Sequence, residues 1–313
     1  MKAFYAPGKV MLCGEYTVTI GQEALALPTQ LGQWMRVWEF EMKDEWKLVW
    51  QSQNIEGQSW WNMSFSLEQF LVDPETLFEE FAEDAIALNL LKMLQQLPMK
   101  TWTPGKSVRI ETQLQFPQEW GLGSSSTLCA LLARWSQGDA QKIQQAVWGG
   151  SGYDVAVAEV GKPLVYWISG DEPNWAEWRL LPELSAKWWI LMPGNKQNSR
   201  ESLSSVKERL LELQQEPFIM HQLKQIIDRI KLAEDVPTME AGLEMYQAIL
   251  GTMLELDTPY QKMGWQPVRG GLCKWLGAWG GDMILVNENY LNHLGDEVKE
   301  WRKVRWNDLV INS

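Results

Sequence analysis

Two glycines and three serines stand directly before an apolar run in the stretch Phe116–Thr127, FPQEWGLGSSST. Gly121 and Gly123 can adopt positive φ angles, so the backbone can curl and approach a ligand closely. Successive N–H groups would then point at an anion, and the start of a following helix would add partial positive charge. The serine hydroxyls could bind phosphate oxygens or a magnesium ion. The predicted phosphate-binding loop consists of Gly121, Leu122, Gly123, Ser124, Ser125 and Ser126.

A simpler interpretation of the same stretch is a helix N-cap with spare serines, because serine is a favoured capping residue. The loop is also not a P-loop of the Walker type, since the pattern G-x-x-x-x-G-K-[ST] does not occur in the chain. Any phosphate binding here must therefore be of another type. The residues of the loop alone leave both interpretations open.

The bulk composition limits the possible classes of protein. The chain has 313 residues, 45% of them hydrophobic and 22% charged, which is typical of a globular protein with a full apolar core. Its formal net charge of −12 argues against non-specific nucleic-acid binding, which requires a basic surface. Three well-separated cysteines and two lone histidines argue against a disulfide framework, a structural zinc site and histidine-based triads.

The N-terminal segment is unlike a signal peptide, because Pro7, Gly8, Lys9 and Glu15 interrupt its apolar residues. No window has the length of a membrane span. We therefore expect a cytoplasmic protein without nucleic-acid or membrane partners, as a monomer or homodimer. The chain also contains 20 tryptophans. Most of them are expected in packing, and a few are expected to line a ligand cleft.

Strands and helices alternate around the serine loop, and their pattern shows how the loop is positioned. Apolar and aromatic runs indicate strands, whereas apolar residues three and four positions apart indicate helices. The strand before the loop runs directly into it, and a helix follows. The predicted elements of the first half are strands at 3–12 and 34–41, a hairpin around Glu56-Gly57, a helix at 76–97, a strand at 107–116 and a helix at 126–135.

The second half contains strands and helices in mixed order, without repeats or low-complexity tracts. Two α+β domains, at 1–180 and 181–313, are the simplest division of the chain. The predicted elements of the second half are a short helix and a strand within 149–169, a strand within 186–195, helices at 202–214, 218–233 and 239–256, a glycine loop at 270–281, a strand at 283–288, a helix at 291–302 and a strand at 304–311.

Five segments in this order resemble those of one kinase superfamily, the GHMP kinases, which include galactokinase, homoserine kinase, mevalonate kinase and phosphomevalonate kinase. The resemblance covers nearly the whole chain, and the G-Y-D-V-A variant is similar to a bacterial subgroup named for G-Y-D-I-A. The segments are APGKVMLCGEY from residue 6, P-x-x-x-G-L-G-S-S from residue 117, GSGYDVAVAEVGKPLVYW from residue 150, PGNKQNSRESL from residue 193 and KWLGAWGGDMILV from residue 274.

The resemblance implies a two-domain α+β fold, with an N-terminal domain like ribosomal protein S5 domain 2 and a ferredoxin-like C-terminal domain. It implies ATP and Mg²⁺ as cofactors. Lys9 matches the lysine that faces the acceptor and the transferring phosphoryl group, where a cation stabilises negative charge. Asp154 matches the aspartate that orients or deprotonates the acceptor hydroxyl. The alternatives are a solvent-facing lysine in a turn and an aspartate that only caps a helix.

Further site residues follow from the resemblance. Ser125 is the expected magnesium ligand. Arg269 and Lys274 lie beside motif loops and could join a cationic cluster around a phosphorylated acceptor, although some of these charges could simply be solvated. The expected substrate-binding residues are Glu15, Lys196, Arg200, Gly280 and Gly281, with Glu15 alternatively structural.

The chain departs from the family pattern at two places. Trp279 stands where the family usually has a glycine. Mevalonate kinases carry a magnesium-binding glutamate about a dozen residues before the aspartate, but here the corresponding stretch has Gln144 and Gln145 and no acid. Magnesium would then rest on Ser125, the nucleotide phosphates and water, which is acceptable because Mg²⁺ needs few protein ligands.

Three hypotheses for the function remain. The first is an ATP-dependent kinase that transfers the γ-phosphoryl group of ATP to mevalonate or phosphomevalonate, as in isoprenoid biosynthesis. The second is a decarboxylase of the same superfamily, which no specific residue supports. The third is a non-catalytic GHMP-fold protein that binds a ligand or partner, which Trp279 and the missing acid favour.

Overall fold

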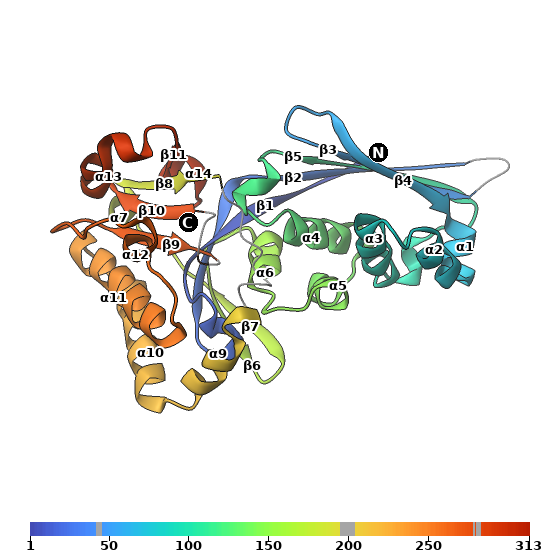
Figure 1. The fold of residues 1–313 in the computed structure, drawn as a ribbon. Helices are drawn as coiled ribbons and strands as arrows, with labels where there is room; N and C mark the ends of the chain where they lie inside the picture. The colour runs from blue at the N-terminus through green and yellow to red at the C-terminus, as the bar shows by residue number, and fades with distance from the viewer. Residues whose placement is uncertain (42–45, 195–203, 278, 280–282) are drawn as a thin grey trace. The chain divides into compact units, whose positions relative to one another are not determined.

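The structure is a computed structural model that describes residues 1–41, 46–194, 204–277, 279 and 283–313 (Figure 1). Contacts between Cα atoms divide the chain into two compact units, each assembled from separate segments. The first unit comprises Met1–Gly8, Leu31–Gln118 and Gly123–Glu159, and the second comprises Lys9–Gln30, Glu119–Leu122 and Val160–Ser313. These units are not the same segments as the predicted domains 1–180 and 181–313, and that division stays a prediction.

Strands and helices occur in short runs of one kind along the chain. The strands are β1 (Lys2–Cys13), β2 (Ala24–Glu41), β3 (Lys47–Gln53), β4 (Ser59–Ser66), β5 (Lys106–Leu114), β6 (Leu164–Ser169), β7 (Glu172–Glu177), β8 (Trp188–Met192), β9 (Cys273–Leu276), β10 (Met283–Asn287) and β11 (Arg302–Arg305). The α-helices are α1 (Leu67–Val72), α2 (Pro74–Glu80), α3 (Ala85–Gln95), α4 (Ser124–Ser136), α5 (Ala140–Val147), α6 (Tyr153–Val160), α7 (Pro182–Ser185), α9 (Lys207–Gln214), α10 (Pro217–Lys231), α11 (Val236–Leu254), α12 (Pro259–Met263), α13 (Glu288–Leu294) and α14 (Trp306–Leu309).

A seven-stranded sheet has the order β4-β3-β5-β2-β6-β7, with β1 beside β2. The long strand β2 belongs to both units. In the first unit it pairs antiparallel with β5, for example Val37 with Ile110, and β5 in turn pairs parallel with β3. In the second unit, Leu25 of β2 pairs antiparallel with Val165 of β6. The loop that precedes α4 follows the inner strand β5, so a paired strand fixes the loop's entry.

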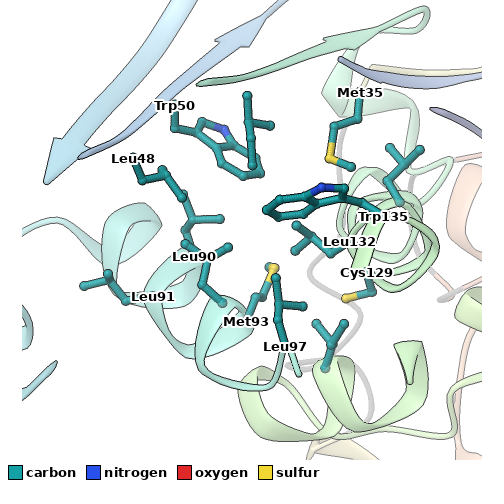
Figure 2. Packing of buried hydrophobic residues seen from close by; sticks show 14 of the residues in the cluster. Met35, Leu48, Trp50, Leu90, Leu91, Met93, Leu97, Cys129, Leu132 and Trp135 are labelled. Atoms are coloured by element: carbon teal, nitrogen blue, oxygen red, sulfur yellow. The ribbon is translucent and has the colours of Figure 1, made fainter. Parts of the chain in front are cut away.

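The core of the first unit lies between the sheet and helices α3 and α4, which lie along one side of β2, β3 and β5 (Figure 1). Figure 2 shows Met35 and Trp50 from the strands pointing toward Leu90 of α3 and Leu132 of α4. Burial alternates along β5, as expected for a strand with one face on the core. The mainly apolar α4 is buried along most of its length, so its packing in the core positions the serine loop at its N-terminus.

The second unit contains a four-stranded antiparallel sheet in the order β11-β8-β10-β9. Polar side chains of α11 bind this sheet. Gln247 donates to the carbonyl of Cys273 across 2.9 Å and accepts from the N–H of Trp275 across 2.8 Å, while Glu240 accepts from the indole of Trp188. Because both amide atoms of Gln247 are paired, α11 is fixed to the edge strand β9.

Several predicted elements are confirmed, including the strand at 3–12, the hairpin of β3 and β4, and the strand before the serine loop. The single helix predicted at 76–97 is wrong. The chain leaves the helical conformation after Glu80, and Asp84 caps a new helix by accepting hydrogen bonds from the N–H groups of Ile86 and Ala87. Apolar spacing continues across the break, so periodicity alone did not reveal it.

Three C-terminal predictions also need correction. The predicted glycine loop at 270–281 includes strand β9, whose four residues are all buried. The helix predicted at 291–302 lies instead at Glu288–Leu294, because the side chain of Asn287 caps its start and Gly295, with φ of 49°, ends it. The strand predicted at 304–311 ends at Arg305 and gives way to α14. Strand β7 was not predicted.

Candidate functional site

The predicted phosphate-binding loop turns sharply into α4. Gly121 has φ of 66° and Gly123 has φ of 87°, conformations that residues with a Cβ rarely adopt. Helix α4 begins at Ser124, two residues earlier than predicted, and Gly123 is its N-cap. No side chain caps the helix there. The interpretation of the serines as an N-cap is therefore wrong. The first N–H groups of α4 have no side-chain acceptor at the cap and can bind another acceptor.

The three serines of the loop have different environments. Ser126 is buried and donates its hydroxyl to the carbonyl of Gly123 across 2.8 Å. Ser124 and Ser125 are partly buried, and their hydroxyls form no hydrogen bond with any described residue. Both line a cavity in the first unit. Two hydroxyls and the start of a 13-residue helix therefore face one open space.

This cavity has a volume of about 270 Å³ and its walls are rich in tryptophan and amide side chains. Flat aromatic walls beside an anion-binding helix start suit a nucleotide, whose base stacks and whose phosphates need N–H donors. The prediction that a few tryptophans line a cleft agrees with this wall. The lining residues are Gln33, Trp50, Ser52, Gln53, Trp60, Trp61, Ile86, Asn89, Leu90, Met93, Thr112, Leu114, Gln118, Ser124, Ser125, Leu128 and Trp148.

One wall of the cavity is held by a hydrogen bond between Trp61 and Asp84. The indole Nε1 of Trp61 donates to Oδ2 of Asp84 across 2.9 Å, while Oδ1 of Asp84 accepts the two N–H groups at the start of α3. The Trp61 hydrogen bond and these backbone donors lower the pKa of Asp84 below its ordinary value of 3.8. One carboxylate thus fixes both the helix start and the orientation of a cavity tryptophan.

Asp154 lies in the first turn of α6, within the first unit, and is the second residue of that helix rather than its N-cap. Its Oδ1 accepts a hydrogen bond from Nε2 of Gln144 across 3.1 Å and another from the N–H of Val155 across 3.0 Å. Its Oδ2 accepts none from the described residues. One carboxylate oxygen is therefore fixed while the other remains available for chemistry.

Gln144 lies in the stretch where the resemblance predicted an acid that the chain lacks, and it is 7% exposed. Its Nε2 also approaches the carbonyl of Gly149 at 3.4 Å, and its Oε1 is buried without a donor. Sequence reasoning noted the absent acid but missed the contact with Asp154, because that contact depends on how the chain turns between α5 and α6.

Lys9 belongs to β1 and lies in the second unit together with the first part of the loop. Its Nζ donates to the carbonyl of Gly121 across 3.0 Å, and its N–H donates to the carbonyl of Leu122 across 2.9 Å. The alternative of a solvent-facing lysine in a turn does not describe this residue. The structure thus brings Lys9 onto the predicted loop, and its role toward a phosphate stays a prediction.

Glu15 and Lys274 form a buried ion pair in the second unit. Lys274 is fully buried and donates to Oε1 of Glu15 and to the carbonyl of Trp275. Burial raises the pKa of Glu15, and Lys274 partly opposes that rise. The charge of Lys274 is used internally, so this lysine does not belong to a solvent-facing cationic cluster. These contacts favour the structural role of Glu15 over a substrate contact.

The structure describes only some of the remaining residues singled out in the sequence. Lys196, Arg200, Gly280 and Gly281 lie outside the described residues. Trp279 is among the described residues and is 5% exposed. Its backbone N–H donates to the hydroxyl of Tyr16 across 3.1 Å. Its ring lies against Gly251 of α11, where an added Cβ would stand 3.2 Å from a ring carbon. The unusual tryptophan is therefore packed inside the second unit, and a helix glycine makes room for it.

The described residues contain no cluster of three or more histidine, cysteine, aspartate or glutamate side chains that could hold a metal ion. A magnesium ion would depend on the nucleotide phosphates, water and a hydroxyl such as that of Ser125. Among the described residues, no helix is long and apolar enough to cross a membrane.

Neither a protein-family profile nor a curated protein matches this chain. Its fold, however, is similar to solved structures. Mevalonate kinase from Methanococcus jannaschii is 16% identical in sequence to this chain, with a TM-score of 0.65. The alignment covers 97% of this chain and 96% of that chain. Phosphomevalonate kinase from Streptococcus pneumoniae, in complex with phosphomevalonate and AMPPNP, has 14% identity, coverage of 97% and 100%, and a TM-score of 0.67.

Galactokinase from Lactococcus lactis, complexed with galactose, has 14% identity, coverage of 100% and 94%, and a TM-score of 0.67. All of these neighbours are GHMP kinases. At these identities the likeness establishes the fold: the chain has the two-domain α+β fold of the GHMP kinases. The resemblance and the fold class predicted from the sequence are confirmed at this level.

Proposed function

We propose that the protein is an ATP-dependent small-molecule kinase of the GHMP type that transfers the γ-phosphoryl group of ATP to mevalonate or phosphomevalonate. The observation that carries this proposal is the start of α4, where two serine hydroxyls without protein partners and uncapped N–H groups face a tryptophan-lined cavity. Because these donors have no partner among the described residues, they can bind the phosphates of a ligand in place of water.

The residues around the cavity fit a nucleotide. The base would lie against the tryptophan wall, and the N–H groups at the start of α4 would bind the phosphates. Ser124 would donate to a phosphate oxygen, and Ser125 would ligate magnesium. ATP supplies the phosphoryl group, and Mg²⁺ neutralises the phosphate charge. The positive φ angles of Gly121 and Gly123 allow the backbone to close around the phosphates.

Lys9 and Asp154 are the proposed catalytic residues. The ammonium group of Lys9, held at the carbonyl of Gly121, would stabilise negative charge on the transferring group. Asp154 would use its unpaired Oδ2 to orient or deprotonate the acceptor, while Gln144 and the N–H of Val155 hold Oδ1. Catalysis would then come mainly from positioning and electrostatics, as is usual in phosphoryl transfer.

The choice of acceptor draws on the neighbours, which include kinases of mevalonate and of phosphomevalonate. The absence of a second acid beside Asp154 fits a phosphate acceptor, whose second pKa of about 6 makes it nucleophilic near neutral pH. Such an acceptor needs cations for positioning, and Lys196 and Arg200 stay the proposed ones. A galactokinase matches the fold equally well, so sugars belong among the candidates to be tested.

Release of ADP, measured with MgATP and one acceptor at a time, tests the proposal. The acceptors are mevalonate, phosphomevalonate, diphosphomevalonate, homoserine and galactose, and the matched control is the Asp154→Asn variant. Turnover that depends on mevalonate or phosphomevalonate and is lost in the variant would establish the kinase. Turnover on a sugar alone would keep the kinase and reject the acceptor.

A separate measurement of AMPPNP binding distinguishes the alternatives when no acceptor is turned over. AMPPNP binding without turnover would favour the non-catalytic GHMP-fold protein that binds a ligand or partner. That alternative is supported by the tight packing of Trp279 in the third motif and by the lack of an acid in the stretch that contains Gln144 and Gln145. The absence of any nucleotide binding would reject both the kinase and the nucleotide site.

A further inference from the structure

A second and larger cavity lies within the second unit, apart from the serine loop. It has a volume of about 630 Å³, which is in the range of pockets that bind small molecules. One wall is a face of α11 that includes Glu244, Ala248 and Thr252. The opposite wall is formed by α12 and the loop that follows it, including Tyr260 and Trp265. The kinase proposal uses none of these residues.

Glu244 provides the only charge among the described residues that line this cavity. Its Oε1 accepts a hydrogen bond from the hydroxyl of Tyr260 and another from the N–H of Cys273, both across 2.7 Å. Its Oε2 accepts none from the described residues. The carboxylate therefore has one oxygen held by the protein and one oxygen without a partner.

Apart from Gln266, which is exposed, the other polar side chains of the wall already have partners within the protein. Both amide atoms of Gln247 bind β9, and Thr252 donates to the carbonyl of Ala248 across 2.9 Å. Thr258 and Gln261 form the capping box of α12. What the cavity offers a ligand is thus the neutral amide of Gln266 and one negatively charged oxygen, Oε2 of Glu244, beside the aromatic rings of Tyr260 and Trp265.

The electrostatic surroundings of Glu244 favour a positively charged ligand. Burial raises the pKa of this carboxyl, while the N–H of Cys273, the Tyr260 hydroxyl and Lys274 oppose the rise and Glu240 adds to it. Lys274 has its own carboxylate partner in Glu15, so Glu244 is left without a direct counter-ion. A cation placed at Oε2 would stabilise the ionised form and could also contact the aromatic faces.

We propose that this cavity binds a small organic cation, a primary ammonium or guanidinium group on an apolar stem, with Oε2 of Glu244 as its anionic partner. A bare divalent metal ion is a poor occupant, because such ions need several oxygen ligands and the wall offers one unpaired carboxylate oxygen. An anion finds no lysine or arginine among the described lining residues. The apolar and aromatic walls accommodate the stem.

Calorimetric titration of the protein with butylammonium chloride tests this site. The titration is done without nucleotide and at constant ionic strength. Butanol, which has the same stem and no charge, is the matched ligand control. We expect saturable butylammonium binding, at least tenfold weaker binding of butanol, and weaker butylammonium binding as the pH falls and Glu244 takes up a proton. The absence of saturable butylammonium binding, or equal binding of butanol, would overturn the proposal.

Two variants localise the binding. Glu244→Gln should weaken butylammonium binding at least tenfold, whereas Glu240→Gln should change it far less, because Glu240 acts on Glu244 only as a nearby charge. Glu240 is a matched control because it lies one turn earlier on α11, accepts hydrogen bonds from Trp188 and Asn287, and does not line the cavity. Binding to Glu244→Gln with wild-type affinity would overturn the proposal.

A further variant covers the case in which Glu244→Gln does not fold. Ala248 is exposed on the same wall, so Ala248→Arg would place a guanidinium group in the cavity and leave the contacts of Glu244 in place. This variant should lose butylammonium binding, and retained binding would place the ligand elsewhere and overturn the proposal. Since no nucleotide or acceptor is present, failure here is separate from failure of the kinase proposal.

Discussion

The amide nitrogen of Gln144 donates a hydrogen bond to Oδ1 of Asp154 across 3.1 Å. The same oxygen accepts the N–H of Val155, so two neutral donors fix one side of the carboxylate. A glutamate at position 144 would instead set a second negative charge against Asp154. Gln144 therefore orients the carboxylate of Asp154, the proposed general base, without adding a second charge beside it.

Replacement of Asp154 by asparagine should lower turnover by about 10²- to 10⁴-fold, the usual contribution of a positioned general base. Replacement of Gln144 by alanine should lower kcat about 10- to 100-fold with little change in the KM for ATP, because a hydrogen bond to a charged group is worth about 1.5–3 kcal/mol. Steady-state kinetics with the identified acceptor measure both effects.

Gln145→Ala is the matched control for Gln144→Ala. The amide of Gln145 donates to the carbonyl of Gly150 across 3.0 Å and makes no contact with Asp154. Its removal should leave kcat within about twofold, since it removes only an exposed hydrogen bond. Equal losses in the two glutamine variants would mean that Gln144 acts through the α5–α6 turn rather than through Asp154.

Two serines of the loop give a pair of substitutions with opposite expected effects: one should change magnesium dependence and the other stability. Ser125→Ala should raise the Mg²⁺ concentration for half-maximal rate about tenfold and leave stability unchanged, because its hydroxyl has no protein partner. Ser126→Ala should cost about 1 kcal/mol of unfolding free energy, since it loses the hydrogen bond to the carbonyl of Gly123. Magnesium titrations and urea unfolding measure the two effects. Unchanged magnesium dependence in Ser125→Ala would remove this serine from the metal role.

The parts of the site that could be predicted from the sequence are those set by neighbouring residues. Gly121 and Gly123 adopt the positive φ angles that glycine allows, which depend on the local turn alone. The segment before them is predicted as a strand from its alternating apolar residues. Lys9 could be identified through its resemblance to a motif. These features depend on backbone stereochemistry and local periodicity, which one sequence contains in full.

The parts that could not be predicted depend on distant pairing. The hydrogen bond between Trp61 and Asp84 joins β4 to the start of α3, and no local pattern reveals it. The same is true of Lys274, whose sequence neighbours suggested a motif loop although its side chain is buried against Glu15. The error at 291–302 was of a different kind, because Asn287 is a local capping signal that apolar spacing obscured.

The buried pair of Glu15 and Lys274 should contribute strongly to stability as a unit. Removal of either partner leaves an uncompensated buried charge, so Glu15→Gln or Lys274→Met should each cost about 3–5 kcal/mol of unfolding free energy. The double variant Glu15→Leu/Lys274→Met should recover most of that loss, because apolar residues of similar size often replace a buried pair without penalty. Urea unfolding at one pH measures all three.

The exposed pair of Lys162 and Glu177 is the control for the buried pair. Its two side chains are 52% and 62% exposed, and Lys162→Ala should cost less than about 1 kcal/mol. Single variants of the buried pair that cost no more than this control would contradict the prediction. Such a result would mean that water reaches Glu15 and Lys274 when one partner is removed.

Asp84 should make the stability of the protein depend on pH at the acidic end. Its pKa is lowered from the ordinary 3.8 by the indole of Trp61 and by N–H groups of α3, so the folded state binds its proton less readily than the unfolded state. The stabilisation is therefore fully present above the unfolded pKa and is lost as the pH falls through the lower folded value.

Asp84→Ala should lower the unfolding free energy by about 1 kcal/mol at about pH 7, the usual effect of losing a helix N-cap. The difference from the wild type should shrink as the pH falls below the ordinary pKa of 3.8 and through the lower folded value, because the wild-type carboxylate then takes up a proton in the folded state as well. Asp84→Asn keeps a capping oxygen without a titrating group, so its stability should change less with pH than that of the wild type. Urea unfolding at several pH values measures these differences. If Asp84→Asn and the wild type had parallel pH profiles, the contacts of Asp84 with Trp61 and α3 would not depend on its charge.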